Sequence, residues 1–433
     1  MALRGGLQFY SLLQDLNGLA AEGALHNVPN IAFANVGLIA PGAGGVARNT
    51  LMLSFGGNAA GPALAAMPAV LLTGGIHARE WIAPAIAYLI AEYLIVNYTT
   101  HPIGPYQTAI RDLVDSRRIY VMPMLNPNGN FVTVYGAGQR QWRKNQRVLP
   151  ATAGAWVAAL TNAVGVPNPP FLNVHDLNPA QDRVTYDVPL YRSNPAAHDT
   201  ITIDPNDPAN LGVDLNRNFS TQNWGQDTYY HGASMLNGNP DLNLYFGPNR
   251  HSEVETQNLE AHIAADPGIE TAIDYHSYSR FILYPTEAFY GGHVGANYTN
   301  LAQMMERLIT TAVGAPPNYR LGDPMSLIEY DAVGSISDFL ALNGGAAYGG
   351  TRAFTVELDP APGAGPAGFD LPENQIMGVF EKNIRGALAL IDEAGRMPEI
   401  QSRCCFWSRT VYSQRALRFL NWNVFGRGNQ LPV

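Results

Sequence analysis

Apolar runs of two lengths alternate along the chain, short ones of strand length and longer ones of helix length. The run Ala69–Ile76 has strand length, and Ile82–Val96, which follows it, is long enough for a helix. Arg118–Leu125 is again strand-like, and it ends in the Asn-Pro-Asn-Gly segment 126–129, which is typical of a turn. The same pattern predicts strands at Ile269–Tyr275, Phe281–Tyr284 and Ala353–Leu358, and helices at Ser252–Ala265 (with Ser252 as N-cap), Leu301–Val313 and Glu373–Ala394.

This alternation predicts an α/β fold with helices on both faces of a sheet, but two segments depart from it. Residues 146–211 are rich in Pro, Asn, Asp and Ala and show little periodicity, so we expect an irregular insertion that decorates the domain. Residues 396–433 form an arginine-rich, aromatic-containing extension of unknown role. We therefore expect a single domain over residues 1–395, followed by this C-terminal extension.

Composition narrows the class of protein. The chain has 433 residues, 46% of them hydrophobic, and its uninterrupted apolar runs fall short of the roughly 18 residues that span a bilayer. We therefore expect a globular protein with a sizeable core and no membrane-spanning helix. The formal charge of −9 argues against nucleic acid as a partner, because nucleic acids bind basic surfaces.

The compartment is less well indicated. The N-terminal segment has no clear signal peptide, whereas the low charge and the many Gly, Pro and Asn residues favour a compact extracellular protein. Cys404 and Cys405 are adjacent, so no internal disulfide framework is expected. We expect a secreted monomer whose signal segment is not part of this sequence, with a cytoplasmic protein as the alternative.

Polar residues gather where the predicted strands end, which is where open α/β sheets place their chemistry. His77 and Glu80 follow the first strand, His276 follows the strand Ile269–Tyr275, and Glu357 lies near the end of the last strand. Taken alone, His77-x-x-Glu80 could be a polar turn at the start of a helix. Two neutral imidazoles and one carboxylate are, however, a common ligand set for a tetrahedral Zn²⁺ with one open position. Glu357 could then accept a proton from water bound there.

Several short motifs accompany these residues. They are HAREW (77–81), NPNG (126–129), WRKN (142–145), GVDLNRNF (212–219), GPNRHSEVE (247–255), HSYS (276–279), YDAVGSISD (330–338) and TVEL (355–358). Together they resemble the zinc metallocarboxypeptidase family of the pancreatic carboxypeptidase A type, over residues 69–394 apart from the insertion. The resemblance implies a three-layer α/β/α sandwich with a mixed, twisted central sheet.

The resemblance also implies a zinc-dependent exopeptidase that removes single residues from the C-termini of peptides and proteins. It implies one Zn²⁺ per chain, held by His77, Glu80 and His276. Asp214 would accept a hydrogen bond from the ring of His77 and fix its tautomer. Glu357 resembles the general base of the family, and Arg143 resembles the arginine that polarises the scissile carbonyl group.

The remaining implied residues bind substrate. Asn216 and Arg217 resemble the pair that holds the terminal carboxylate, and Tyr330 resembles the mobile tyrosine that closes over it. Arg79 and Tyr278 would line the next subsite outward. The clamp formed by Asn216 and Arg217 also weakens one alternative, a cell-wall peptide amidase or deacylase on the same scaffold, because such an enzyme does not need a free carboxylate. A catalytically inactive binding module would lack a ligand or Glu357, and none is missing.

The side-chain preference depends on the pocket. In the family, the residue seven after the closing tyrosine is Ile for apolar ends and Asp for basic ends, and here it is Ser337. The other expected pocket residues are Leu283, Met325, Ala332, Ile336 and Thr355. A largely apolar wall with one hydroxyl predicts broad specificity that favours apolar and aromatic ends. Glu329, if it faced inward, would instead favour basic ends, so a basic-residue-specific enzyme is the second alternative.

Overall fold

The structure is a computed structural model of the chain. It describes residues 9–39, 47–101, 104–136, 138–147, 173–178, 183–191, 194–203, 212–221, 244, 246–247, 249–286, 292, 294–310, 319–328, 332–343 and 350–395.

The main sheet has eight strands in the order β1-β2-β4-β3-β8-β11-β9-β10. Their bounds are β1 Ala32–Ile39, β2 Arg48–Gly56, β3 Ala69–Gly74, β4 Arg118–Met122, β8 Ile269–Ser277, β9 Phe281–Leu283, β10 Arg320–Gly322 and β11 Arg352–Leu358. Strands β4, β3, β8 and β11 run parallel at the centre, whereas β2 pairs antiparallel with β4 and β9 pairs antiparallel with β11. The sheet is therefore mixed, as predicted.

Strand β3 shows why the centre of this sheet is apolar on both faces. Ala69 and Leu71 belong to one hydrophobic cluster, and Val70 and Leu72 belong to the other. This division follows from strand geometry, because successive side chains point to opposite faces. All four side chains are fully buried, and burying each Val or Leu contributes about 1.5–3 kcal/mol. Both faces of the sheet therefore need a cover of helices.

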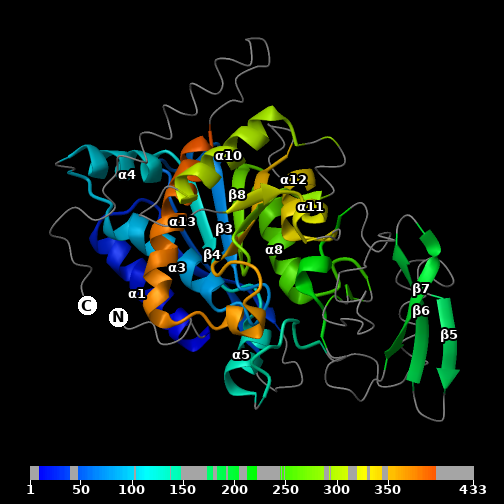
Figure 1. The fold of residues 1–433 in the computed structure, drawn as a ribbon. Coiled ribbons are helices and arrows are strands. Elements are labelled where there is room, and N and C mark those ends of the chain that lie inside the picture. Colours follow the sequence, from blue (N-terminus) through cyan, green and yellow to red (C-terminus); the bar gives the residue numbers. More distant parts are fainter. Residues whose placement is uncertain are drawn as a thin grey trace.

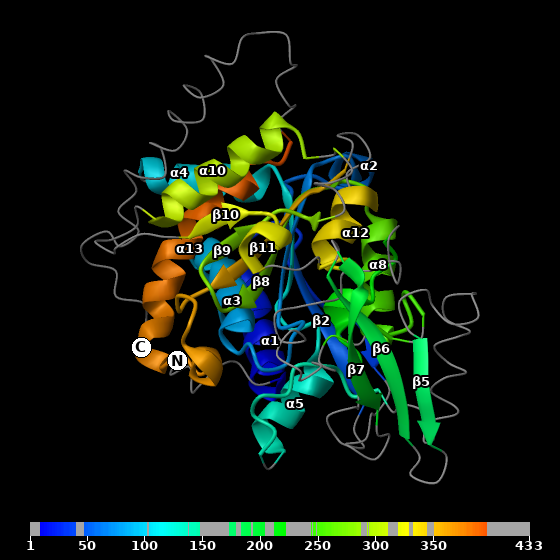
Figure 2. The ribbon, with the colours of Figure 1, turned by 45° about the vertical axis from the view of Figure 1, so that its right-hand side comes forward.

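Helices cover both faces and complete three layers, as Figures 1 and 2 show. The larger cluster joins the sheet to α1 (Phe9–Leu25), α3 (Ile82–Val96), α4 (Pro105–Asp115), α10 (Ala296–Thr310) and α13 (Glu373–Glu393). The smaller cluster joins it to α8 (Val254–Ala265) and α12 (Ile336–Asn343). Shorter helices are α2 (Gly61–Ala65), α5 (Pro127–Tyr135) and α11 (Pro324–Ile328), with 3₁₀ turns η2 (Leu215–Arg217) and η5 (Gly365–Phe369). None of the helices in the described ranges is long and apolar enough to cross a membrane.

The predicted three-layer α/β/α class is confirmed, and α3 has the predicted bounds, but two local predictions are wrong. The segment 126–129 is not a separate turn, because Asn126 is the N-cap of α5 and its side chain accepts a hydrogen bond from the Gly129 N–H at 2.9 Å. Glu253, and not Ser252, occupies the N-cap position of α8. The Ser252 hydroxyl instead donates to the Glu253 carboxylate at 2.6 Å.

The predicted insertion contains regular structure. Strands β5 (Asn173–Asn178), β6 (Arg183–Tyr191) and β7 (Asn194–Ile203) form a separate antiparallel sheet in the order β5-β6-β7. The prediction of an irregular segment therefore does not hold for these residues. In β6 the apolar residues Val184, Tyr186, Val188 and Leu190 do alternate with polar residues or proline, but the many Pro, Asn and Asp residues around them are typical of loops and hid this period-two signal. The extension 396–433 lies outside the described residues.

Candidate active site and metal centre

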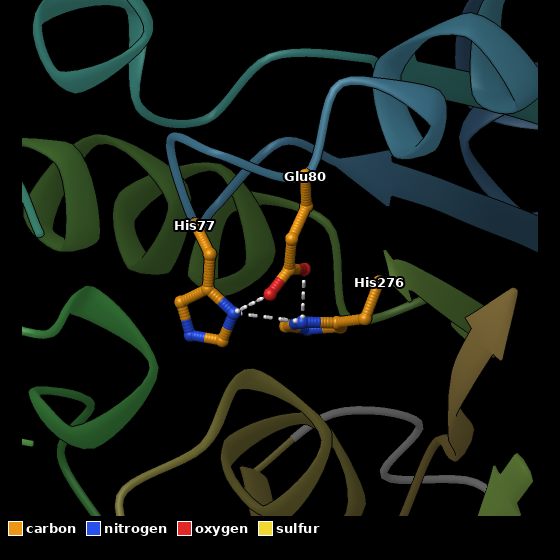
Figure 3. Close-up of side chains that lie close together, drawn as sticks. All are labelled: His77, Glu80 and His276. Carbon is orange, nitrogen blue, oxygen red and sulfur yellow. Dashed lines mark hydrogen bonds and ion pairs between the residues drawn. The ribbon is translucent and has the colours of Figure 1, made fainter. Parts of the chain in front are cut away.

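The carboxyl ends of β3 and β8 bring the three predicted metal ligands together. His77 and Glu80 lie in the segment between β3 and α3, and His276 lies near the end of β8. Gly75, at a φ of 64°, lets the chain turn away from β3 just before His77. Figure 3 shows the three side chains pointing toward one another, and all three are buried. They are the only cluster of potential metal ligands found within the described part of the chain.

Their ligand atoms meet at short distances. Glu80 approaches His77 Nδ1 at 2.8 Å through Oε1 and His276 Nδ1 at 3.0 Å through Oε2, and the two Nδ1 atoms are 3.0 Å apart. Zn–N and Zn–O bonds of about 2.0–2.1 Å place the ligands of a tetrahedral zinc about 3.3 Å from one another. The observed spacing is close to this value, so the site fits a zinc ion with little rearrangement.

The electrostatics of the site also favour a positive charge among these atoms. Burial opposes ionisation of Glu80, but His77 and His276 outweigh it and lower its pKa. Burial likewise opposes protonation of His276, yet Asp274 and Glu80 outweigh it and raise its pKa well above the usual range. In the metal-free protein these two carboxylates favour the protonated ring of His276. A metal ion would take the place of this proton, since metal binding releases protons from the ligands.

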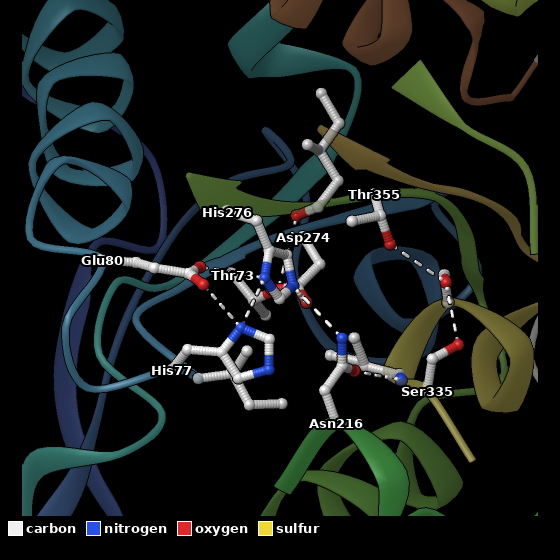
Figure 4. A network of polar contacts seen from close by, with 12 residues as sticks. Thr73, His77, Glu80, Asn216, Asp274, His276, Ser335 and Thr355 are labelled. Atoms are coloured by element: carbon white, nitrogen blue, oxygen red, sulfur yellow. Dashed lines mark hydrogen bonds and ion pairs between the residues drawn. The ribbon is translucent and has the colours of Figure 1, made fainter. Parts of the chain in front are cut away.

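A carboxylate lies behind each histidine and turns its Nδ1 toward the centre. The Nε2 atom of His77 is 3.2 Å from Asp214, and that of His276 is 2.6 Å from Asp274. Asp274 also accepts a hydrogen bond from the Thr73 hydroxyl at 2.7 Å (Figure 4). Such partners fix the tautomer and ring orientation of metal-binding histidines. The contact of Asp214 was predicted, whereas that of Asp274 was missed. Its signal was the i, i+2 spacing to His276, which places both side chains on one face of β8.

Asp214 also orients the predicted carbonyl-polarising arginine. The Nε and Nη2 atoms of Arg143 both donate to Asp214 Oδ2, at 3.0 and 2.9 Å. The Nη1 atom of Arg143 lies 4.0 Å from Glu80, so the guanidinium group is beside the metal ligands. Burial of Asp214 is outweighed by Arg143 and His77, which hold its pKa well below the usual range. One ionised carboxylate thus positions both a predicted ligand and Arg143.

Glu357 lies on β11 directly opposite His276 in the parallel register. Burial and the nearby Glu80 carboxylate raise its pKa to about 7. The side chain nevertheless lines the same pocket as His77 and Arg143. A carboxylate with this pKa accepts and returns a proton near neutral pH, which is the property that a general base needs.

Asn216 and Arg217 form part of the 3₁₀ turn η2, whose start is capped by the Asp214 carboxylate. Both side chains are buried and line the pocket. The side-chain oxygen Oδ1 of Asn216 accepts a hydrogen bond from the Ile336 N–H at 3.0 Å, and the side-chain nitrogen Nδ2 lies 3.3 Å from Nε2 of His276. Gly334 lets its own segment pack closely against η2, because a Cβ atom at this position would lie only 2.5 Å from the main-chain oxygen of Arg217.

The pocket encloses about 440 Å³ of empty space, part of it open solvent. Besides the residues already described, it is lined by Leu283, Tyr284, Thr286, Pro324, Ile328, Ala332, Ser335, Ser337 and Thr355. The predictions for Leu283, Ala332, Ser337 and Thr355 agree with this lining. Those for Ile336 and Met325 do not. Ile336 begins α12 and packs in the smaller hydrophobic cluster. Of the residues around Met325, it is Pro324 and Ile328 that line the pocket.

Two predicted subsite residues share one contact outside this pocket. The Arg79 guanidinium group lies 4.3 Å from the centre of the Phe369 ring, and the Tyr278 ring packs edge-on against Phe369 at 5.0 Å. The Tyr278 hydroxyl donates to the Gly365 carbonyl group at 2.7 Å. Phe369 was not predicted. The predicted closing tyrosine, Tyr330, lies outside the described residues, as does Glu329.

The mixed α/β fold and the three converging side chains fit the class of metal-dependent hydrolases. The chain belongs to the zinc carboxypeptidase family, whose model matches residues 46–386. Membership of this family makes it a metallocarboxypeptidase, a peptidase of the hydrolase class.

Individual relatives are more distant. The chain is 27% identical to carboxypeptidase B of Astacus astacus over 325 residues, which are 74% of this chain and 78% of that protein. It is 27% identical to carboxypeptidase A4 of Mus musculus over 331 residues, which are 75% of this chain but 58% of that protein. The chain thus spans less than two thirds of the length of the mouse relative.

Solved structures show the same fold. Bovine thrombin-activatable fibrinolysis inhibitor matches with a TM-score of 0.58 over 90% of this chain and 97% of that chain, at 18% identity. Carboxypeptidase A from Helicoverpa armigera matches with a TM-score of 0.55 over 90% of this chain and 75% of that chain, at 19% identity.

Proposed function

We propose that this protein is a zinc-dependent carboxypeptidase that hydrolyses the C-terminal peptide bond of peptides and proteins. One observation carries the proposal. The Nδ1 atoms of His77 and His276 and the carboxylate of Glu80 converge within 3.0 Å at the edge of a pocket that Arg143 and Glu357 also line.

One Zn²⁺ per chain would be held by His77, Glu80 and His276. Bound there, zinc would supply a Lewis acid that makes water more acidic and polarises a carbonyl group. Glu357 lies within the same pocket and takes up the proton that water loses, then returns it to the leaving amine. Its raised pKa, about 7, suits both transfers.

Arg143 and Arg217 bind different parts of the substrate. Arg143, held by Asp214 beside the metal ligands, stabilises the negative charge that develops on the scissile carbonyl oxygen. Arg217 and Asn216 line the pocket and bind the terminal carboxylate of the substrate. A guanidinium group suits this role, because it matches the geometry of a carboxylate. Arg143 and Arg217 together place the last peptide bond of the substrate over the metal site.

We further propose broad specificity with a preference for apolar and aromatic ends. Leu283, Pro324, Ile328 and Ala332 supply an apolar wall, and no acidic side chain among the described lining residues faces it apart from the catalytic Glu357. An apolar wall discriminates weakly among side chains of similar size.

The test compares three blocked substrates that end in Phe, namely a dipeptide with a free carboxylate, its C-terminal amide, and a longer peptide cleaved internally. We expect hydrolysis of the first, loss of activity with a chelator, recovery with zinc, and very slow reaction of the amide. Comparable rates for free and amidated ends would replace the exopeptidase with an amidase or deacylase. A strong preference for Arg over Phe ends would favour the basic-residue-specific alternative.

A further inference from the structure

One wall of the substrate pocket carries a chain of hydroxyl groups that ends at a buried carboxylate. The Thr355 hydroxyl donates to that of Ser337 at 3.2 Å, and Ser337 is 3.1 Å from the hydroxyl of Ser335. Ser335 in turn donates to the Asp338 carboxylate at 2.8 Å. All four side chains are buried, and the three hydroxyl residues, but not Asp338, line the pocket. Figure 4 shows the chain from Thr355 to Ser335 beside the metal ligands.

The direction of every hydrogen bond in this chain of hydroxyl groups is determined at the end where Ser335 meets Asp338. A hydroxyl group carries one proton and two lone pairs. The proton of Ser335 is committed to Asp338, and Ser335 also accepts from the Asp338 N–H at 3.1 Å, as a cap of α12. Ser337 must therefore donate to Ser335, and Thr355 donates to Ser337. All three protons point away from the pocket toward Asp338.

The pocket consequently meets the lone pairs of Thr355 and Ser337 and not their protons. Thr286, whose hydroxyl has no partner among the described residues, lines the same pocket but can either donate or accept, so it does not discriminate. Along the wall formed by these hydroxyl groups, the direction of their hydrogen bonds therefore distinguishes a side chain that donates from one that only accepts.

We propose that this hydroxyl chain selects C-terminal residues whose uncharged side chains donate hydrogen bonds, such as Asn, Gln, Thr and Tyr, and rejects Asp and Glu. The inference rests on the proposed function, since it concerns the side-chain pocket of that same site. Apolar ends remain good substrates because the opposite wall is apolar. Side chains with a donor gain a hydrogen bond to Thr355 or Ser337 that offsets their loss of water, whereas a carboxylate placed against these two hydroxyl groups meets lone pairs.

The test uses blocked dipeptides that end in Leu, Asn or Asp, three side chains of nearly equal size, and compares their kcat/KM values. In the wild-type protein we expect Asp to fall below Asn by more than about a hundredfold, because a desolvated charge would lack a donor. Comparable values for Asn and Asp would overturn the proposal. A protein that cleaves none of the three, with zinc bound, would instead contradict the proposed function.

Single substitutions distinguish the effect of the hydroxyl chain from the effect of other polar groups in the pocket. In Thr355→Val and in Ser337→Ala, the ratio of Asn to Leu should fall about threefold to tenfold, the worth of one hydrogen bond. Thr286→Val, which removes a pocket hydroxyl that can either donate or accept, should leave the ratio of Asn to Asp unchanged. An unchanged or higher ratio of Asn to Leu in both chain variants would refute the selection.

The polarity itself has a separate test. Ser335→Ala removes the acceptor of the Ser337 proton, which can then point into the pocket, so the ratio of Asp to Asn should rise by more than about tenfold. Loss of the helix cap costs about 1 kcal/mol of stability, which far-UV circular dichroism and melting will monitor. A folded Ser335→Ala protein with an unchanged ratio would show that the chain is not polarised as inferred.

Discussion

Each candidate zinc-binding histidine lies between the metal position and a carboxylate, and the two carboxylates differ in what else they hold. Asp214 binds Arg143 as well as His77, so it contacts both a candidate metal ligand and the arginine proposed to bind substrate. Asp274 binds only His276 and the Thr73 hydroxyl among the contacts described for it. Replacing Asp274 therefore perturbs the metal ligand with little direct effect on the residues that bind substrate.

Asp274→Ala should weaken zinc binding about tenfold to a hundredfold, the usual effect of removing such a partner. His276 would lose the acceptor that fixes the orientation of its ring. The contact between its Nδ1 atom and Glu80 would then also be less well aligned. Competition with a fluorescent chelator measures this directly, without any assay of activity. Thr73→Val keeps the carboxylate and serves as the matched control, with a smaller loss. Equal zinc affinity in Asp274→Ala and the wild type would show that the ring is held by its packing alone.

Glu357→Gln should retain zinc and lose activity by about 10²–10⁴, because Gln is of equal size but cannot accept the proton. Zinc content and kcat are measured on the same sample. Retention of most of the turnover would remove Glu357 from the role of general base, whereas simultaneous loss of zinc would mean that it supports the metal site.

For single residues, the three candidate ligands predicted from the sequence lie together in the structure, but one of the residues that contact them was missed. His77, Glu80 and His276 each lie in a short motif that can be recognised in the sequence, and the structure brings the three side chains together. Asp274 was missed because its spacing of two residues from His276 occurs between any two side chains on one face of a strand, and does not by itself indicate a hydrogen bond. Ile336 was misplaced because one position in a helix decides between pocket and core.

The start of helix α8 contains a pair of buried acids. Glu253 accepts a hydrogen bond from Asn145 at 2.7 Å and pairs with Arg147 at 2.6 Å, whereas Glu255 is only 3.4–3.5 Å from Asn145. Burial and the neighbouring Glu253 raise the pKa of Glu255 to about 7. The helix therefore contains a carboxyl group that prefers to be neutral in the folded protein.

The raised pKa predicts how stability depends on pH. Between the usual pKa of 4.5 and about 7, the folded state binds the Glu255 proton more tightly than the unfolded state does, so stability falls as pH rises through this window. Glu255→Gln should remove this loss and be more stable than the wild type at pH 8, by up to about 3 kcal/mol, but not at pH 4.5.

Urea unfolding of both proteins at the two pH values measures the difference. Asp112→Asn, at a carboxylate whose side chain is 59% exposed, is the control for removing one negative charge. A constant difference between Glu255→Gln and the wild type across the window would show that Glu255 stays ionised when folded.

Elements were easiest to predict where one period dominates. Helix α3 is buried almost throughout and has clear ends, so its bounds were predicted correctly. The strands β5 to β7 were not predicted, although β6 alternates apolar and polar positions, because the Pro, Asn and Asp residues of the same segment are typical of turns and loops. Helix α5 was taken for a turn because its first residues, Asn-Pro-Asn-Gly, are also those of a turn.

In the whole molecule, the candidate metal site connects the segment after β3 with the end of β8, two strands that are already paired in the sheet. Zinc would add stability because it binds the folded chain, in which its ligands are assembled, and not the unfolded one. At a free zinc concentration about a thousand times Kd, the gain is about 4 kcal/mol. In a chain of this size the gain corresponds to a rise in melting temperature of several degrees.

This stabilisation should grow with pH. The raised pKa of His276 means that zinc must displace a proton from the site, so the apparent affinity for zinc increases as pH rises toward that pKa. We expect the difference in melting temperature between zinc-loaded and chelator-treated protein to be larger at pH 8 than at pH 6. His276→Ala, which lacks both the ligand and the proton, should show a small difference at either pH. A difference that is equal at both pH values in the wild type, or that persists in His276→Ala, would mean that zinc stabilises the fold from somewhere other than this site.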